Sequence, residues 1–500
     1  MHRPAAGSGG VMSVLKSRGL AFSVLLVVPV LSAASPAGHT VPIGETPAIG
    51  HHYDQAAIDA GHYSFDELFE AGRQLFDARF NILDGQGRPE STGGGAARGP
   101  GQPPFIRTSG PDANACVGCH AQPRSGGAGD FVANVFVLAQ VLDPVTRSID
   151  GAFSNERNTL GMFGAGAIEM LAREMSAELI AIREAATVRA RETGAPVTVP
   201  LRAKGVDFGA ITVLPDGRVD PTAIDGVDWD LVVKPFHQKG AVVSLREFSN
   251  NAMNHHHGMQ SSERFGHDSD ADNDGMSNEL TEGDITAVTL YQAALEAPRQ
   301  AWPANGQARR AARQGKALFS EIGCGRCHRP SLLLASREFT EPNPYNPPGN
   351  LRPQDVDGVY RFDLVRTSRS PLVRPRGDGS VEVQAFTDLK RHDLNDDELN
   401  HFANEQVPQG FLHGFADPAG FTVPPQPRPT GEFLSRKLWD VGNSGPYGHR
   451  GDLTLMTEAI HFHGGDARAE RDAFFALDDH QQAQIIEFLK TLVVADSRRD

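Results

Sequence analysis

The stretch Cys116-Val117-Gly118-Cys119-His120, with its counterpart Cys324-Gly325-Arg326-Cys327-His328, decides how this 500-residue chain is organised. The two copies together contain all four cysteines of the protein. Two thiols three positions apart can add to the two vinyl groups on one edge of a porphyrin, and the next histidine then supplies an axial nitrogen to the iron. Each copy therefore predicts one covalently bound haem c, attached through Cys116 and Cys119 or Cys324 and Cys327, with His120 or His328 as iron ligand.

Other interpretations of a Cys-x-x-Cys pair fit this chain less well. A redox dithiol needs a single active pair, and a four-cysteine zinc site usually lies within roughly 20 to 30 residues of chain. Here the pairs stand far apart, at 116–119 and 324–327, and a histidine follows each of them. The pattern favours two haems over a disulfide, a dithiol or half a zinc site.

The N-terminal segment has the pattern of an export signal. Lys16 and Arg18 precede an apolar run from Leu20 to Leu31, and the small residues Ser32-Ala33-Ala34 follow it. The run is short for a membrane span. We expect residues 1–34 to be a cleaved signal peptide and the mature protein to be soluble in the periplasm, where haem is attached to exported chains. An uncleaved membrane anchor is the alternative.

Composition excludes one class of partner and indicates how the chain is divided into domains. The 47 Lys and Arg against 62 Asp and Glu give a formal charge of -15 with no basic run, which argues against nucleic acid and permits a basic protein partner. The chain is too long for one core, and its 53 glycines and 34 prolines predict long loops. We expect a mainly α fold with two haem domains, at 60–300 and 305–495, and a few short strands.

A short pattern precedes each motif, namely Gly72-Arg73-Gln74-Leu75-Phe76 and Gly315-Lys316-Ala317-Leu318-Phe319. It predicts a helix that leads into each haem-binding turn. The first copy carries an insertion, 84–114, whose Gly and Pro content predicts a surface loop. Periodicity predicts further elements: two helical stretches within 158–191, strands between 197 and 233, helices at 244–259 and 284–297, and a last helix from the Asp478 cap through Val493.

With these segments in order, the chain resembles the bacterial di-haem cytochrome c peroxidase superfamily, and above all its di-haem oxidoreductase branch of peroxidases or thiol oxidoreductases. The likeness covers about residues 65–494. It implies two cytochrome c-like domains. Besides the two motifs, the segments that carry it are Leu231–Phe236, Ser244–Phe248, Asn278–Ala287, Asp388–Asp393, Pro446–Gly451 and Ala459–Gly465.

The resemblance also implies further iron ligands. The distal ligand of the second haem lies about one helix beyond the Pro-Tyr-x-His segment, where this chain has His463, with His461 as the alternative. Many members have methionine there, and imidazole predicts a lower reduction potential. The detachable histidine of the first haem has no counterpart, because no histidine follows His120 until His237. Its iron is either open or bound by one of His255, His256, His257 and Met259.

One carboxylate resembles a catalytic residue of the family. Glu169 matches the distal glutamate that moves a proton between the two oxygens of peroxide. A helix-surface carboxylate is the other interpretation. The tryptophan that bridges the haems in well-studied members has no recognisable counterpart, so no residue is assigned to electron transfer between them.

An acidic loop matches a calcium-binding pattern. Asp270, Asp272 and Asp274 occupy positions 1, 3 and 5, a glycine follows at position 6, and Asn278 falls at the ninth. Thr281 stands where a bidentate glutamate is expected. Because superfamily members often hold calcium between their haem domains, we expect Ca2+ here, with a solvated acidic turn as the alternative.

The resemblance implies a function as well. It is that of a periplasmic di-haem oxidoreductase in which the C-terminal haem relays electrons to the N-terminal haem, where hydrogen peroxide is reduced. The implied partners are a small-molecule oxidant and an electron-donor protein such as a small cytochrome c or a cupredoxin. Two rivals stay open: a non-catalytic di-haem electron carrier, and a haem oxidase or oxygenase that acts on an organic or thiol substrate.

Overall fold

A computed structural model describes residues 44–86, 113–130, 132–134, 156–272, 274–365, 373, 375–403 and 431–494. Of these residues, 37% are helical and 15% lie in strands, so the fold is mixed, with more helix than strand. The expected signal peptide and most of the expected insertion at 84–114 fall outside the described residues. Within the described ranges, no helix combines the length and the apolar character that a bilayer span requires.

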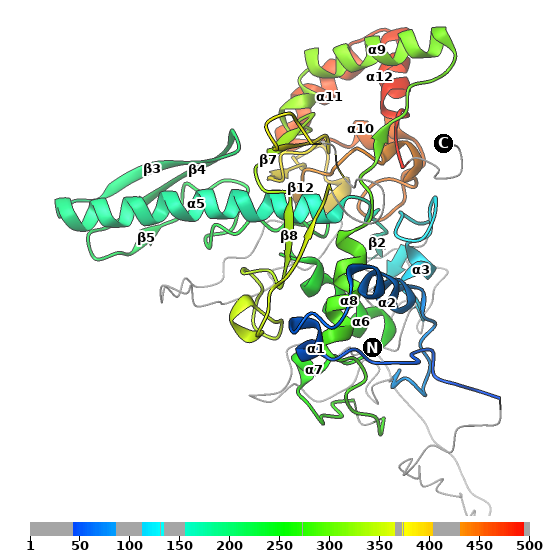
Figure 1. The fold of residues 1–500 in the computed structure, drawn as a ribbon. Coiled ribbons are helices and arrows are strands. Elements are labelled where there is room, and N and C mark those ends of the chain that lie inside the picture. The colour runs from blue at the N-terminus through cyan, green and yellow to red at the C-terminus, as the bar shows by residue number, and fades with distance from the viewer. Residues whose placement is uncertain are drawn as a thin grey trace, which may run out of the picture. The chain divides into compact units, whose positions relative to one another are not determined.

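The helix before the first motif is α2, Phe65–Asp77, and it crosses α8, Glu282–Ala293 (Figure 1). The buried face of α2 includes Gly72. A Cβ at this position would overlap the backbone carbonyl of Ala287. The two helices can therefore approach this closely only because position 72 has no side chain.

The second motif follows α9 (Gly306–Glu321), which crosses α12 (Asp479–Leu489) in an equivalent pair of helices. A Cβ at Gly315 would overlap the carbonyl of Gln484 on α12. Gly315 holds the same place in the repeated sequence pattern as Gly72. The repeat thus marks the crossing points of two similar helix pairs, and the first helix of each pair precedes a motif.

The other predicted helices form with changed bounds. The region expected to hold two helical stretches forms one long helix, α5, Ala165–Thr193. The helix predicted at 244–259 is α6, Leu245–His257. The prediction that the last helix continues through Val493 is wrong. It ends at Leu489, because β13 (Leu492–Val493) pairs with β6 (Arg299–Gln300) instead.

Three antiparallel strands run beside α5 as a small sheet (Figure 1). They are β3 (Val197–Ala203), β4 (Val206–Val213) and β5 (Val219–Asp220). Exposed and buried side chains alternate along β3 and β4, so one face of the sheet packs on the helix.

The remaining elements are short. The helices are α1 (Gln55–Asp59), α3 (Cys116–Cys119), α7 (Ser262–Phe265), α10 (Met456–His461) and α11 (Arg468–Phe475). The strand pairs are β1 (Val132–Asn134) with β2 (Glu156–Asn158), β7 (Leu332–Leu334) with β10 (Val381–Val383), β8 (Glu338–Glu341) with β9 (Tyr360–Asp363), and β11 (Arg391–Asp393) with β12 (Glu432–Leu434).

Each motif lies next to an apolar core of its own. The larger core includes buried residues of α2, α5, α8 and the β3–β5 sheet, and Cys116 packs against it. The second core includes buried residues of α9, α11 and α12, and Cys324 packs against it. Burial of these apolar side chains is the main stabilising contribution around both motifs.

Candidate haem sites

The first motif forms a single helical turn, α3. Its thiols, Cys116 and Cys119, form no disulfide. The next residue, His120, donates its backbone N–H to the carbonyl of Cys116 and holds ring atom Nδ1 3.2 Å from the carbonyl oxygen of Gly127. A carbonyl can only accept, so Nδ1 carries the hydrogen and the lone pair lies on Nε2. That tautomer is the one an iron ligand needs.

The second motif repeats this arrangement. Its first residues form a short 3-10 turn, and His328 donates its backbone N–H to the carbonyl of Cys324. Nδ1 of His328 lies 3.2 Å from the carbonyl oxygen of Phe386 and 3.1 Å from that of Arg436. Burial lowers the pKa of both His120 and His328 to about 4, so both rings are neutral and able to bind a metal.

The helix before each motif supplies an aromatic ring to the motif histidine. Phe76 of α2 lies 6.2 Å from His120, and Phe319 of α9 lies 6.4 Å from His328, measured between ring centroids. Phe76 packs in turn on Tyr291 of α8, and Phe319 packs on Phe488 of α12. The two helix pairs therefore position the two histidines in the same way.

His463 lies opposite His328, where the sequence places the distal ligand. Their ring centroids are 6.4 Å apart, and Nδ1 of His463 lies 2.7 Å from the carbonyl oxygen of Ala459. An imidazole nitrogen lies about 2 Å from a bound metal and about 1.2 Å from its own ring centroid, which gives about 6.4 Å for two rings on opposite sides of one ion. The alternative, His461, is exposed and packs on Phe475.

The histidine cluster at the end of α6 reaches the first motif in part. His257 holds Nε2 3.3 Å from the sulfur of Cys116 and Nδ1 2.7 Å from the carbonyl oxygen of Ala113. His256 lies close enough to His120 for its charge to add to the effect of burial in lowering the pKa of that ring. Met259 is fully buried in the larger core, and His255 is half-buried.

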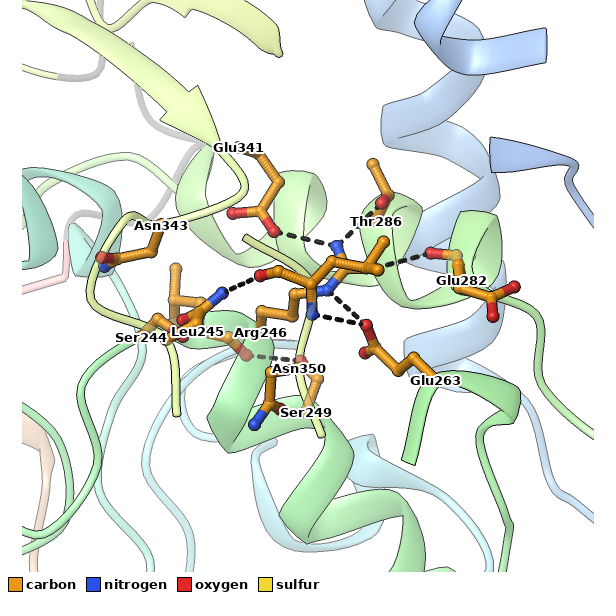
Figure 2. Close-up of polar contacts among 12 residues, drawn as sticks. Ser244, Leu245, Arg246, Ser249, Glu263, Glu282, Thr286, Glu341, Asn343 and Asn350 are labelled. Atoms are coloured by element: carbon orange, nitrogen blue, oxygen red, sulfur yellow. Dashed lines mark hydrogen bonds and ion pairs between the residues drawn. The ribbon is translucent and has the colours of Figure 1, made fainter. Parts of the chain in front are cut away.

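A fully buried arginine fixes the position of α6 (Figure 2). The guanidinium of Arg246 lies 2.9 Å from the carboxylate of Glu263 and 2.9 Å from that of Glu341. It also donates to the hydroxyl of Thr286 and to the backbone carbonyl of Glu282. These contacts link α6 to α7, α8 and β8, so the helix that carries His256 is held from three sides.

Glu169 is fully buried, and both of its carboxylate oxygens are engaged. Oε1 pairs with Arg173 and accepts a hydrogen bond of 2.8 Å from Asn343. Oε2 accepts one of 2.8 Å from the backbone N–H of Leu245 at the start of α6. The interpretation as a helix-surface carboxylate is therefore wrong. These contacts hold α5 against α6, and the role in proton transfer stays a prediction.

The acidic loop brings three of its four predicted ligands together. Ligand atoms of Asp270, Asp272 and Asp274 lie within 4.8 Å of one another. Asn278 does not join them, because its amide oxygen accepts a hydrogen bond from the backbone N–H of Asp268, at 2.9 Å. The left-handed backbone of Asn278, φ 55°, accompanies this placement.

Glu279 stands near the three aspartates in place of Asn278. Its side chain is 3% exposed, and Oε2 accepts a hydrogen bond of 2.7 Å from the backbone N–H of Gln260. Oε1 has no hydrogen-bond partner among the described residues. Burial and the charges of the aspartates raise the pKa of Glu279 to about 10. The three aspartates offer the hard oxygen ligands that Ca2+ prefers, and Glu279 lies close enough to feel their charges but does not join their 4.8 Å group.

A stretch after β12 contacts the second motif and approaches the first. The backbone carbonyl of Arg436 is one of the two that face Nδ1 of His328. The next residue, Lys437, donates from Nζ to the carbonyl oxygen of Gly161, at 2.7 Å. The charge of Lys437 also adds to burial in lowering the pKa of His120. One short segment therefore links the surroundings of the two motif histidines.

Trp439 follows in the same segment and is buried. Its ring packs on Gly164 at the start of α5, where a Cβ would overlap the indole. Within the described part of the chain, its indole N–H has no hydrogen-bond partner. No sequence pattern indicated this residue, because it lies far along the chain from both motifs.

One further cluster contains a motif cysteine. Cys327, Asp388 and His392 place three ligand atoms within 4.8 Å of one another. Such a set can bind zinc only if Cys327 is a free thiolate. A thioether link from Cys327 to haem excludes that use, so the two interpretations are mutually exclusive.

Comparisons with known proteins leave the family open. No protein-family model matches the sequence, and no curated protein matches it. Hydrazine synthase of Kuenenia stuttgartiensis is similar at 16% identity and a TM-score of 0.27, over 58% of this chain and 78% of that one. A MauG-like protein associated with microbial copper homeostasis is similar at 17% identity and a TM-score of 0.25, over 58% and 79%. Likenesses this low carry no argument, so the function is inferred from the residues of this chain.

Proposed function

We propose that the chain is a periplasmic di-haem c-type oxidoreductase that reduces hydrogen peroxide at the N-terminal haem with electrons relayed through the C-terminal haem. The observation that carries the proposal is the arrangement shared by His120 and His328. Each follows two cysteines that form no disulfide, and each directs Nδ1 to a backbone carbonyl. Bound at these motifs, haem would supply iron that exchanges electrons one at a time.

The two sites differ in the groups that face the motif histidine. This difference supports two separate roles, electron transfer at the second motif and reaction with the oxidant at the first. His328 has a second imidazole, that of His463, nearby, so these two histidines would both hold the iron of a haem bound here, as in an electron-transfer centre. Among the described residues, the aromatic rings in contact with His120 are those of Phe76 and Phe248. Neither phenylalanine can bind a metal. His256 also approaches His120, but among the described residues no histidine ring packs on that of His120 as His463 packs on His328, so we propose this site for the iron that an oxidant reaches.

The segment that contains Arg436 and Lys437 supports electron transfer between the two sites. It touches His328 through a backbone carbonyl and approaches His120 through a side chain. Trp439, buried in the same segment, adds an aromatic ring to this connection. We propose this segment as the bridge that the sequence did not reveal.

Calcium, localisation and partners complete the proposal. Ca2+ would be held by Asp270, Asp272, Asp274 and Glu279 in the loop that leads into α8. Residues 1–34 would direct export and be removed. The acidic chain fits a basic electron donor, such as a small cytochrome c or a cupredoxin.

Spectroscopy of the haem-loaded protein tests the proposal. We expect electron paramagnetic resonance of the ferric protein to show one low-spin centre and one high-spin or exchangeable centre. We also expect carbon monoxide to bind one ferrous haem per chain, and peroxide to be turned over with a cytochrome c donor. Two six-coordinate haems that bind no carbon monoxide would instead identify an electron carrier. Turnover with oxygen and an organic or thiol substrate, but not with peroxide, would identify an oxidase or oxygenase.

A further inference from the structure

His237 lies in a tight turn with an unusual backbone. Its φ is 61°, in the left-handed region that few residues other than glycine adopt. The neighbours Phe236 and Val242 pair as an isolated β-bridge, and the carbonyl of His237 accepts a hydrogen bond of 3.1 Å from the backbone N–H of Gly240. Backbone strain of this kind occurs often at functional sites, where the surrounding structure maintains it.

The C-terminal half of the chain holds this turn in place. The residue after His237 is Gln238, whose amide oxygen lies 2.8 Å from Nδ1 of the buried His449. The backbone N–H of Leu434 donates to the carbonyl of Gln238, at 2.8 Å. The carbonyl of His449 in turn accepts a hydrogen bond of 3.0 Å from the backbone N–H of Asn158 on β2. The turn is therefore fixed by contacts with two distant segments.

The ring of His237 is linked to that of His120 by one aromatic ring, Phe248. Its centroid lies 5.5 Å from that of Phe248, and Phe248 lies 6.4 Å from His120. Part of the residue is exposed, and burial by the protein around the imidazole is the largest cause that lowers its pKa, to about 4. The charges of His256 and Arg157 lower the pKa further, so these two side chains also approach the ring.

We propose that His237 is the acid–base residue of the first haem site, with Arg157 nearby to stabilise negative charge. The inference rests on the proposed function. In peroxide reduction, the neutral imidazole would accept the proton from the oxygen nearer the iron and return it to the farther oxygen. The O–O bond breaks, and the farther oxygen leaves as water. In all, the peroxide takes up two electrons from the donor protein and two protons from solvent, and yields two molecules of water.

His237 suits this role better than Glu169 does. In the described part of the chain, no hydrogen bond engages the ring nitrogens of His237, whereas both oxygens of Glu169 are bound to neighbours. A low pKa keeps the imidazole in its basic form at neutral pH. A carboxylate that already accepts hydrogen bonds from fixed donors is poorly placed to receive a proton.

The experiment compares ligands that need a base with one that does not. Hydrogen cyanide and hydrogen peroxide must each lose a proton to bind ferric haem, whereas carbon monoxide binds ferrous haem unchanged. The variant is His237→Asn, because asparagine tolerates a left-handed backbone, and His237→Gln repeats the test in a second background. His267→Asn on an exposed surface is the matched control. Stopped-flow mixing of the haem-loaded full chain gives the three association rates.

We expect His237→Asn to slow cyanide and peroxide association by about 100-fold, the size typical of a lost general base. Carbon monoxide association should stay within about two-fold, which a general structural disturbance would not allow. Unchanged cyanide and peroxide rates would overturn the proposal, and so would a loss in Glu169→Gln with none in His237→Asn. A ferric low-spin centre that becomes high-spin in His237→Asn would overturn it too, because His237 would then be an iron ligand.

The proposed function can fail independently of this inference. A wild-type protein that binds cyanide in a His237-dependent way but does not reduce peroxide would overturn peroxide as the substrate and leave the base in place. If the wild type and His237→Asn reduce peroxide equally well, the proposed function stands and the role of His237 as the base is overturned.

Discussion

His328 and His463 lie with their ring centroids 6.4 Å apart, and each holds Nδ1 against a backbone carbonyl. The two Nε2 lone pairs are thereby left for a metal between the rings. The pair lies beside the second core, near the helix crossing of α9 and α12. The second haem is therefore expected to be bound by two histidines, and its reduction potential should depend on His463.

Replacing His463 by methionine should raise the reduction potential of the second haem on the order of 100 mV, because a thioether stabilises ferrous iron relative to imidazole. Spectroelectrochemistry of the full chain measures the change. The control is His461→Met, which alters an exposed ring two residues away. A potential shift in the control, with none in His463→Met, would assign the ligand to His461.

Replacing Gly315 by alanine should lower the free energy of unfolding by about 3 kcal/mol, at the upper end of overpacking effects, because the added methyl overlaps the backbone of α12. Urea unfolding followed by circular dichroism measures the loss. Gly377→Ala is the control, since a Cβ there meets no atom within 4 Å. Equal stability of both variants would show that α9 and α12 do not cross at Gly315.

Glu341 predicts a pH dependence of stability. Burial and the nearby Glu169 raise the pKa of its carboxyl from 4.5 to about 7, although Arg246 opposes the shift. The folded state therefore binds a proton that the unfolded state loses, and the stabilisation present below pH 4.5 is lost as the pH rises through about 7. Relative to Glu341→Gln, the wild type should lose about 3 kcal/mol of unfolding free energy over this window.

The control for that measurement lies on the same strand. Glu338 is exposed and pairs with Arg361, so Glu338→Gln removes one exposed ion pair and should change the free energy of unfolding by less than about 1 kcal/mol. A difference between wild type and Glu341→Gln that stays constant from pH 4.5 to 7.5 would contradict the prediction.

Calcium should stabilise the chain through the acidic loop. At a Ca2+ concentration roughly a hundred times the dissociation constant, binding to the folded state adds about 3 kcal/mol, so a chelator should lower the melting temperature and Ca2+ should restore it. Glu279→Gln should abolish most of this response, whereas Asp268→Asn, outside the cluster, should leave it unchanged. If Ca2+ still raises the melting temperature of Glu279→Gln by the full amount, Glu279 is not a calcium ligand.

Local patterns in the sequence predicted the parts of the fold that depend on neighbouring residues. The two motifs, the helices before them and the Asp478 cap are all encoded within one or two turns of chain. The partner of α2 was not predictable, because its crossing with α8 depends on a contact between Gly72 and Ala287 across most of the first half of the chain. The residue at which α12 ends was not predicted, because Leu492 pairs with β6, a strand that is distant in the sequence.

The same distinction between local patterns and long-range contacts holds for the candidate sites. His463 could be placed by counting from a motif. His237 could not, because its relation to His120 depends on a left-handed turn held by His449. The calcium loop shows the same limit: spacing selected Asn278, whose amide oxygen instead accepts a hydrogen bond from the backbone N–H of Asp268.

Two covalently attached haems underlie the proposed chemistry at both motifs. They are tested by the mass of the full chain, purified from a host that matures cytochromes c, together with its pyridine haemochrome spectrum. We expect the mass of the processed chain plus two haems and a spectrum equivalent to two haem c groups per chain. A colourless protein with the mass of the bare polypeptide would show that neither motif carries haem.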